Sequence, residues 1–444
     1  MTSNCLRPCK VLIAGGGISG LALAAMLEKS GVDFILLEAY SQIVAQAGAG
    51  IYMLPNGLRI LDQLGGYDAL VSKVDFADFM NYRDQSGEVI VTINGWATSM
   101  IERYGYPSLW VGRRELLQSL YDCISDKSKL LTDKRVATVR HLDDAVEVTT
   151  TDGSTYHGDI LVGTDGVHSR VRQEMVRHAT EQGVAQDYTE DHKIPAKYEC
   201  LFGASTAVAG IPRGYLGFGV NEGFSYIIGT GPEDRVYWCL TEKMDRTLFG
   251  TDIPKFSKED EDRFVDKHLN DKITADVRLA DLYKAKLDAI HTPLREFVYG
   301  NWHLDRMIVL GDATHKMTPI LGQGGNQALE TVAAMTNSLM AALKLPGSKT
   351  LSKLEIDGMF DQVQTLRAPR ASKMMRESHR RQCLDGLETP ELAEMMFHKF
   401  PQIAQDLAAA FWNAALPPAV SVQSLPIPPK KKSVPFDDEI RAKL

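Results

Sequence analysis

The chain has 444 residues and a formal net charge of −8, with 44% hydrophobic and 24% charged residues. These values are ordinary for a folded globular protein of two or three domains, and the acidic balance argues against nucleic acid as a partner. The six cysteines are scattered without the paired spacing of a metal site, so no metal is expected and free thiols in a reducing compartment are predicted.

The first informative stretch is 10–39, KVLIAGGGISGLALAAMLEKSGVDFILLEA. An apolar run at 11–14 leads into GGGISG, and a helix-like segment at 21–29 follows. A second apolar run at 34–37 ends at Glu38. This order of strand, glycine turn, helix, strand and acid predicts dinucleotide binding; the alternative is an ordinary strand–helix turn rich in small residues.

Each residue of this motif has a physical role. Gly15 permits a tight turn, Gly17 lets the backbone approach a pyrophosphate, and Gly20 allows close packing of helix and strand. The phosphate is expected at the helix N-terminus, where free N–H groups and the helix dipole favour an anion. Glu38 is placed to accept hydrogen bonds from ribose hydroxyls.

The following region, up to residue 185, is predicted to mix helices and strands. The pattern predicts a helix at 56–64, a hairpin at 79–93, a helix opening at Trp110 and running to 124, and strands within 136–150. The sequence GTDGVHSRVR then reads as a strand end, a polar turn and the start of a helix. There Asp165 can cap the helix or bind a ligand, and Arg172 can pair with a carboxylate or phosphate.

The amino-acid composition changes near residue 199. Residues 200–240 are rich in glycine and aromatic residues, which predicts a mainly antiparallel sheet and a candidate wall of a substrate cavity. A solvated helix is predicted at 255–272. Tyr226, in the strand FSYIIG, is a candidate hydrogen-bond donor to substrate, with an ordinary packing tyrosine as the alternative.

A second strand, glycine-rich loop and helix occupy 301–343. The strand ends at Asp312, which can accept a sugar or ribityl hydroxyl. The backbone of the loop at 322–326 can point N–H groups at an electron-rich ring edge that becomes anionic. A helix is predicted at 327–343.

The C-terminal region is predicted to be helical with a proline-rich end. The basic segment 362–382 is interpreted as a solvated helix covering the first domain, or as a surface for an anionic membrane or a reductant phosphate. The apolar helix at 407–416 is too short to span a bilayer, so it packs on the body or on a partner, or lies in a membrane interface. The tail from 417 is an ordered strap or a loose end.

Three blocks in order, GGGISG with Glu38, GTDGVHSRVR and GDATHKMTPILGQGGN, resemble the FAD-binding signature of group A flavin monooxygenases, the family of para-hydroxybenzoate hydroxylase. The pieces QAGAGIYMLPNGLRILDQLG, YECLFGAS and RVYWCL resemble a fungal branch of that family. That branch includes FAD-dependent epoxidases of indole-diterpene and meroterpenoid biosynthesis.

The resemblance implies an α/β fold with a Rossmann-like FAD-binding domain of the GR2 type, an inserted mainly antiparallel substrate-binding sheet and a C-terminal helical segment. The expected FAD-binding parts are 1–78, 109–185 and 291–385. A sheet insertion is expected at 79–108, the substrate-binding sheet domain at 186–290, and the C-terminal helix and tail at 386–444.

The resemblance also implies the cofactor contacts. Gly322 to Gly325 would face the N1–C2 edge of the flavin ring, with Pro319 beside it, and Asp165, Gly166 and Arg172 belong to a segment associated with both FAD and NADPH. The full implied set for FAD is Gly15, Gly17, Gly20, Glu38, Gly48, Tyr52, Arg113, Asp165, Gly166, Arg172, Asp312, Pro319, Gly322, Gly324 and Gly325.

The implied chemistry is that of an FAD-dependent monooxygenase. NADPH or NADH reduces FAD, O2 adds to give a flavin C4a-hydroperoxide, and one oxygen atom passes to an electron-rich carbon. We expect epoxidation of a prenyl alkene in a fungal terpenoid or meroterpenoid. Aromatic ring hydroxylation of the salicylate or para-hydroxybenzoate type is the first alternative, and a non-catalytic flavin-binding protein is the second.

The expected partner is a hydrophobic small molecule. No secretory signal or uninterrupted apolar run of about 20 residues is visible, so no transmembrane helix is predicted. The expected location is the cytoplasm, or the periphery of an intracellular membrane contacted by the C-terminal segment.

Overall fold

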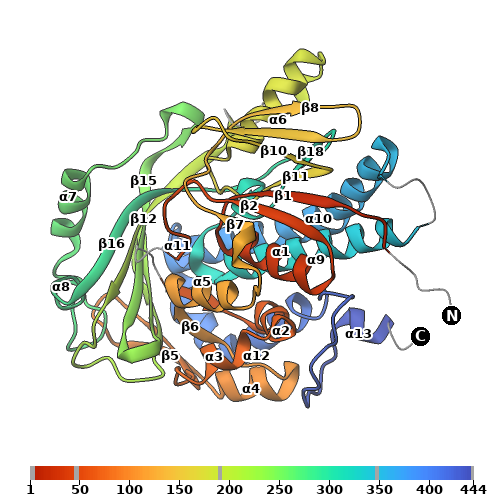
Figure 1. The fold of residues 1–444 in the computed structure, drawn as a ribbon. Coiled ribbons are helices and arrows are strands. Elements are labelled where there is room, and N and C mark those ends of the chain that lie inside the picture. Colours follow the sequence, from red (N-terminus) through yellow and green to blue (C-terminus); the bar gives the residue numbers. More distant parts are fainter. Residues whose placement is uncertain (1–5, 45–49, 189–192, 346–349, 442–444) are drawn as a thin grey trace.

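The structure is a computed structural model that describes residues 6–44, 50–188, 193–345 and 350–441 (Figure 1). Its central sheet has the strand order β18-β19-β11-β1-β2-β7, with every neighbouring pair parallel except β18 and β19. The strands are β1 (Lys10–Ala14), β2 (Asp33–Leu37), β7 (Leu130–Leu131), β11 (Ile160–Gly163), β18 (His303–Leu304) and β19 (Met307–Val309). Three distant stretches of chain therefore build one sheet.

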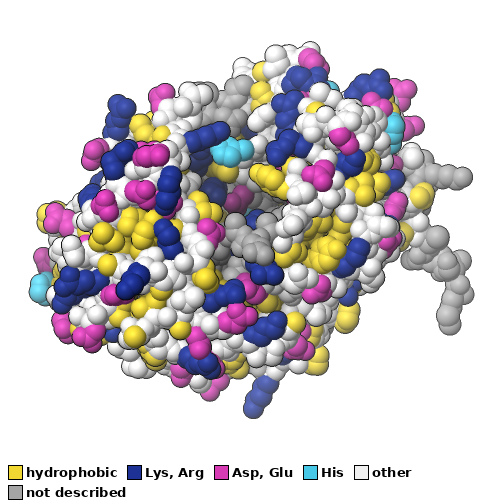
Figure 2. Space-filling model, turned by 60° about the vertical axis from the view of Figure 1, so that its left-hand side comes forward, with side chains coloured by type: hydrophobic (Ala, Val, Ile, Leu, Met, Phe, Trp, Pro, Cys, Tyr) yellow, Lys and Arg dark blue, Asp and Glu magenta, His cyan; other side chains and the backbone are white. Residues whose placement is uncertain are grey.

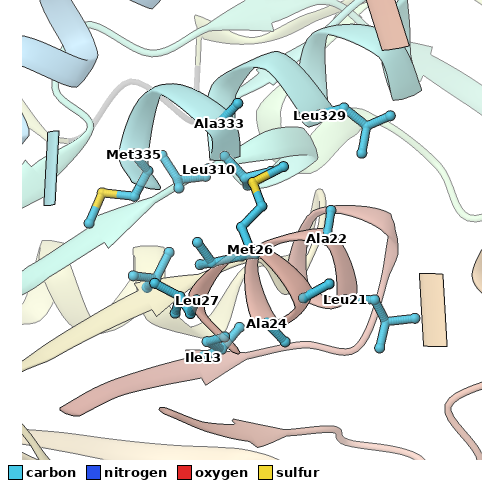
Figure 3. Packing of buried hydrophobic residues seen from close by; sticks show 14 of the residues in the cluster. Ile13, Leu21, Ala22, Ala24, Met26, Leu27, Leu310, Leu329, Ala333 and Met335 are labelled. Carbon is cyan, nitrogen blue, oxygen red and sulfur yellow. The ribbon is translucent and has the colours of Figure 1, made fainter. Parts of the chain in front are cut away.

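Both faces of this sheet pack against other elements, and the side chains of β1 therefore alternate between two hydrophobic cores. Val11 and Ile13 pack with α1 (Ile18–Lys29) and α9 (Gln323–Lys344), and Figure 3 shows the buried side chains of these helices meeting. Leu12 and Ala14 pack on the other face against α6 (Arg170–Glu181) and a three-stranded sheet. That sheet consists of β8 (Val136–His141), β9 (Val146–Thr150) and β10 (Thr155–Gly158).

The second large sheet has seven strands in the order β16-β12-β15-β14-β13-β4-β5. All its pairs are antiparallel except β13 with β4. Its strands are β4 (Phe79–Arg83), β5 (Val89–Asn94), β12 (Pro195–Ser205), β13 (Leu216–Val220), β14 (Phe224–Thr230), β15 (Val236–Phe249) and β16 (Lys286–Arg295). The hairpin at 79–93 thus extends the sheet expected from 200–240, and β16 carries it past residue 290.

The two faces of the seven-stranded sheet have different covers. Helices α7 (Lys258–His268) and α8 (Leu279–Lys284) pack on one face. Phe264, Val265 and His268 are buried there, so the segment expected to be solvated is a half-buried amphipathic helix. On the other face lie α4 (Trp96–Tyr104), the 33-residue α10 (Lys353–Asp385) and α12 (Phe400–Ala415).

Shorter elements connect these layers. The strands β3 (Gly50–Met53) and β6 (Leu109–Gly112) pair antiparallel, as do β17 (Phe297–Val298) and β20 (His315–Lys316). The remaining helices are α2 (Pro55–Leu64), α3 (Tyr67–Val71), α5 (Arg113–Asp122), α11 (Pro390–Glu394), the π-helical turn η8 (Met395–Lys399) and α13 (Asp437–Arg441). The 3₁₀ turns are η1 (Lys127–Lys129), η2 (Ala185–Asp187), η4 (Pro232–Asp234), η5 (Gly250–Asp252), η6 (Gly311–Ala313) and η7 (Pro319–Leu321).

Two predicted helix starts were wrong. Trp110 lies in β6 because Leu109–Gly112 pairs with β3, and the helix begins only at Arg113. Conversely, α9 begins at Gln323, so the expected glycine loop forms the first helical turn. There the Asn326 side chain donates to the carbonyl oxygens of Tyr52 and Gly322, which fixes glycine-rich backbone in a helical conformation.

Figure 2 shows one face of the molecule, which is hollowed near its centre and carries Lys and Arg interspersed with Asp and Glu. Among the described residues, each helix is too short or too polar to cross a membrane.

Candidate active site

The first glycine turn has the geometry that its motif predicts. Gly15 has a φ of +102°, which only glycine adopts readily. A Cβ built on Gly20 would lie 1.9 Å from the carbonyl oxygen of Gly15, so helix and strand touch there. A Cβ on Gly17 would meet no atom within 4 Å, and α1 begins directly after this residue without a side-chain cap. The turn therefore presents open space in front of free backbone N–H groups.

Glu38 lies at the end of β2 beside this turn. Its carboxylate accepts hydrogen bonds from the N–H of Gly16 at 2.6 Å and of Tyr40 at 2.9 Å. The side chain is thus held next to the glycine turn, at the place where the motif puts a ribose. The ribose contact itself stays a prediction.

The second glycine segment, which comprises Pro319 and residues 322–326, has a similar arrangement. Gly322 (φ +61°) precedes α9 and provides no side-chain cap, and a Cβ on Gly324 would meet no atom within 4 Å. Gly325 is nearly as open, since its nearest neighbour would be Ile51 at 3.5 Å. The N-terminal dipole of α9 consequently faces open space, where it favours a negative charge.

The two glycine segments are adjacent in space although about 300 residues separate them in sequence. A Cβ on Gly311, just before Asp312, would lie 2.2 Å from Oγ of Ser19 in the first turn of α1. Ile18 also lies 3.8 Å from the Cβ position of Gly325. The N-terminal ends of α1 and α9 therefore border one region.

Asp312 is a half-exposed carboxylate in η6, and its Oδ2 lies 2.7 Å from Nζ of Lys316. Burial acts to raise the pKa of Asp312, but the Lys316 ammonium and the nearby Arg113 outweigh it, so the pKa is lowered. Asp312 is ionised at neutral pH and can accept hydrogen bonds from hydroxyl groups. Arg113, at the first position of α5, is close enough to Asp312 to affect its pKa, and its predicted contact with FAD stays a prediction.

The third motif is occupied by contacts within the protein. Asp165 accepts hydrogen bonds from Oγ of Ser169 and the N–H of Arg170, both at 2.6 Å, and so caps α6. Arg172 points inward and donates to the carbonyl oxygens of Asn301 and Tyr188. The backbone of Gly166, by contrast, has a φ of +77° and open space at its Cβ position. Cofactor contacts by these residues stay predictions, and Gly48 lies outside the described residues.

An apolar cavity of about 250 Å³ adjoins the second glycine segment. Pro319 and Gly322 form part of its lining, and so does Tyr52 of β3. Strands β4, β5, β13 and β14 and helices α10 and α12 provide most of the remaining wall. The aromatic lining includes Tyr82, Trp96, Trp110, Phe218, Phe411 and Trp412.

Tyr52 stands between the cavity and α9. A Cβ on Gly322 would lie 2.9 Å from the Tyr52 ring. The Tyr52 hydroxyl donates to Oγ of Ser108 and accepts from Nε1 of Trp96, both at 2.8 Å. Burial raises the pKa of Tyr52 to about 12, so it remains a neutral phenol.

The structure corrects the placement of Tyr226 on the cavity wall. Tyr226 is fully buried on the opposite face of β14, and its hydroxyl donates to Oδ2 of Asp271 at 2.9 Å. Side chains alternate along a strand, so it is the neighbouring Ile227 that lines the cavity. Tyr226 is a packing tyrosine.

Sequence reasoning missed that α10 and α12 are walls of the cavity. Arg381 and Leu384 of α10 and Leu407, Phe411 and Trp412 of α12 line it. The signal was present as helical spacing, because residues 400, 404, 408, 411 and 412 share one face at intervals of three or four. That spacing shows which face is buried but not what lies beneath it.

A buried polar network behind α9 was also missed. Glu330 and Arg367 are fully buried and form an ion pair at 2.5 Å, and Arg370 adds a second at 2.6 Å. Asn56 of α2 donates to Glu330 at 2.7 Å. Burial acts to raise the pKa of Glu330, but Arg370 and Arg367 outweigh it and lower the pKa to about 2. The network ties α2, α9 and α10 together below the second glycine segment.

The chain matches a family model described as an FAD-binding domain over residues 8–199 and 217–378. It is 38% identical over 383 residues to the FAD-dependent monooxygenase spyC of Aspergillus fumigatus. The alignment covers 84% of this chain and 78% of spyC. The chain belongs to this family of FAD-dependent monooxygenases. The monooxygenase olcE of Penicillium canescens is 35% identical over 427 residues, or 94% of this monooxygenase and 90% of olcE.

Solved structures confirm the fold class. HpxO of Klebsiella pneumoniae, complexed with FAD and uric acid, superposes with a TM-score of 0.75 at 22% identity, over 93% of this monooxygenase and 97% of HpxO. A salicylate hydroxylase in complex with its substrate superposes with a TM-score of 0.68 at 18% identity, over 94% and 98% of the two chains.

The residues present fit FAD. The N-termini of α1 and α9, after Gly17 and Gly322, have no side-chain caps and have open space in front of them. Both N-termini border the same region of the molecule. An ionised carboxylate, Asp312, precedes the N-terminus of α9. This arrangement provides N–H donors for the pyrophosphate at one end, a hydroxyl acceptor and N–H donors for the ring edge at the other.

Proposed function

We propose that this monooxygenase uses NADPH or NADH and O2 to epoxidise a prenyl alkene of a fungal terpenoid or meroterpenoid metabolite. The observation that carries the proposal is the aromatic cavity whose lining includes Pro319 and Gly322 of the second glycine segment. A hydrophobic substrate in that cavity would lie directly against the flavin ring edge. The fungal sources of the 35–38% identical monooxygenases agree with the proposal.

When bound, FAD supplies hydride acceptance from the nicotinamide and activation of O2 for transfer of one oxygen atom. The N–H groups at the start of α9 stabilise negative charge on the ring edge. Pro319 and Tyr52 exclude water from the space between ring and substrate. The aromatic walls hold an alkene by dispersion contact and orient it toward the second glycine segment.

The protonation states of the lining favour an alkene over a phenol ring as the reacting group. Hydroxylation of a phenol is helped by a base that removes the phenol proton. Burial raises the pKa of Tyr52 and of Tyr82 to about 12, and Glu377 is paired with Arg380 at 2.9 Å. The two neutral phenols are poor bases, whereas epoxidation needs no base. Aromatic ring hydroxylation is the second candidate, supported by the fold shared with salicylate hydroxylase.

One incubation separates these candidates. The purified holoenzyme is supplied with NADPH, O2 and a prenylated phenol, and the product is analysed by mass spectrometry and proton NMR. Both products gain one oxygen atom, but an epoxide loses its alkene proton signals and a catechol loses an aromatic one. Catechol formation would overturn epoxidation. A yellow protein that oxidises neither NADPH nor NADH with any substrate would be the non-catalytic flavin-binding alternative.

We further propose that the outer face of the C-terminal segment contacts an intracellular membrane from the cytoplasm. Phe397, Ile403 and Leu407 are 39%, 41% and 42% exposed, and Leu407 also lines the cavity, so the apolar surface continues into it. A hydrophobic substrate could pass from lipid to cavity along this face. Flotation with phosphatidylcholine–phosphatidylserine vesicles tests the contact. Binding should fall in the variant Phe397→Ser/Ile403→Ser, and equal flotation of both proteins would refute it.

A further inference from the structure

In the part of the chain that the structure describes, two charged pairs lie at the wall of the largely apolar cavity, and the pair formed by Arg381 and Asp385 is the more buried of the two. Arg381 of α10 lines the cavity, and its Nε lies 2.8 Å from Oδ1 of Asp385, one helical turn later. The two side chains are 18% and 0% exposed. The guanidinium carbon lies 4.7 Å from the ring centre of Tyr82 and 5.1 Å from that of Phe400, so aromatic rings surround the charge.

One hydrogen-bond donor of the Arg381 guanidinium is unpaired among the described residues. This donor is Nη2, which is buried. Buried donors are nearly always paired in folded proteins, because an unpaired one loses its hydration without compensation. The Arg381 side chain as a whole lines the cavity and is 18% exposed, so the guanidinium is within reach of a ligand there.

Other polar groups of the lining are already engaged. The hydroxyl of Tyr82 donates to Sδ of Met80 at 3.0 Å, and Glu377 and Arg380 pair with each other. Nε1 of Trp110 also lacks a partner among the described residues, but it packs against β14, where a Cβ on Gly229 would lie 2.0 Å away. Arg381 is therefore the cavity group that combines a charge with an unused donor.

The charge balance indicates which kind of atom it binds. The Asp385 carboxylate compensates the Arg381 guanidinium, and Tyr82 adds no charge because its phenol stays protonated. The other cation of the lining, Arg380, is already paired with Glu377, so a carboxylate ligand would bring a further negative charge without an unpaired cation to balance it. A neutral oxygen accepts the hydrogen bond without that cost.

We propose that Arg381 is a specificity-determining residue whose guanidinium donates to a neutral oxygen of the substrate, a phenol, alcohol or carbonyl oxygen on an otherwise apolar skeleton. This inference rests on the proposed function for the apolar skeleton and adds the polar group and its partner. The single contact would fix which end of the skeleton meets α10 and hence which carbon meets the second glycine segment.

Binding to the holoenzyme tests the proposal without turnover. The probes are 4-geranylphenol, geranylbenzene and 4-geranylbenzoate, which share a skeleton and differ in one group. Trp96, Trp110 and Trp412 line the cavity, so quenching of tryptophan fluorescence reports binding. The wild type should bind the phenol at least ~10-fold more tightly than the hydrocarbon, the size expected for a hydrogen bond to a charged group, and more tightly than the benzoate.

Two variants assign the effect to the pair. Arg381→Met/Asp385→Asn removes both charges together, so no buried carboxylate is left unpaired, and should abolish the preference for phenol while geranylbenzene still binds. Asp385→Asn alone leaves the cation uncompensated and should strengthen benzoate binding ~10-fold. Arg376→Met, at an exposed position of the same helix, is the control and should behave as the wild type.

Tighter binding of benzoate than phenol by the wild type would overturn the proposal. So would a double variant that still prefers phenol, or one that weakens phenol and geranylbenzene equally. If the enzyme prefers phenol but does not form an epoxide, the proposed function is rejected and this inference stands. If it forms an epoxide but shows no preference for phenol, only this inference is rejected.

Discussion

At the scale of single residues, Gly17 and Gly20 are three positions apart and have opposite surroundings. A methyl group on Gly17 enters open space, whereas one on Gly20 would lie 1.9 Å from the carbonyl oxygen of Gly15. The first glycine leaves room for the cofactor and the second brings helix and strand together. The same motif therefore contains one residue that serves binding and one that serves folding.

Gly17→Ala should consequently keep the melting temperature of the apoprotein and lose FAD affinity, because its methyl group occupies the pyrophosphate space. Gly20→Ala should destabilise the fold by about 1–3 kcal/mol, since the backbone must move apart. Circular dichroism of the apoproteins and the ratio of flavin to protein absorbance after purification measure the two effects. A Gly17→Ala protein with full flavin content would contradict the assignment.

At the residue level, the turn has the geometry that its motif predicts at Gly15, Gly17 and Gly20, with Glu38 beside it, while the cofactor contacts of these residues stay predictions. Prediction failed for Tyr226, because the alternation of a strand defines two faces and does not say which one meets the cavity. The packing of α7 and α8 on one face decides this, and these helices come later in the chain. Arg381 was missed for the same reason, as its surroundings come from β4, β13 and α12.

At the scale of elements, most of the longer helices were predictable, whereas their ends and the short helices α3, α4 and α8 were not. Glycine disfavours helix, so 322–326 was expected to be a loop, yet the Asn326 side chain and the contact with β3 wind it into α9. The central sheet followed from its apolar runs and acidic ends. The order of its strands required contacts between stretches about 300 residues apart.

The Glu330 network supplies a pH-dependent part of the stability of α9 and α10. The pKa of Glu330 falls from 4.5 to about 2 on folding, so its contribution, about 3 kcal/mol, is complete above pH 4.5 and is lost as the pH falls toward 2. Glu330→Gln cannot titrate and leaves Arg367 buried without its ion pair, which costs about 3–5 kcal/mol at neutral pH.

Urea unfolding of the wild type and Glu330→Gln over a pH series measures this effect. The difference in unfolding free energy between the two proteins should shrink as the pH falls below 4.5. Taking the difference removes the acid sensitivity that both proteins share. A difference that stays constant with pH would show that Glu330 keeps its ordinary pKa in the folded protein.

At the scale of the whole molecule, the tail returns to the beginning of the chain. The fully buried Arg59 of α2 donates to both carboxylate oxygens of Asp438 at 2.5 Å, and its guanidinium carbon lies 4.1 Å from the ring centre of Phe436. The N–H of Val422 donates to Oε1 of Gln63 at 2.9 Å. The tail is thus an ordered strap over α2, the helix whose Asn56 reaches the Glu330 network.

Releasing this strap should expose Lys430–Lys432 to protease. Asp438→Asn removes the shorter of the two ion pairs of the buried Arg59 and leaves only Glu439, whose Oε1 lies 3.9 Å from Nε, which costs up to about 3–5 kcal/mol where the strap meets α2. Trypsin should therefore cut the variant after these lysines well before it cuts the wild type, with the products identified by mass spectrometry. Asp234→Asn, which removes an ion pair with the exposed Arg213, is the matched control and should cost at most about 1 kcal/mol. Equal cleavage of Asp438→Asn and the control would mean that apolar contacts such as that of Phe436 hold the strap without the ion pair.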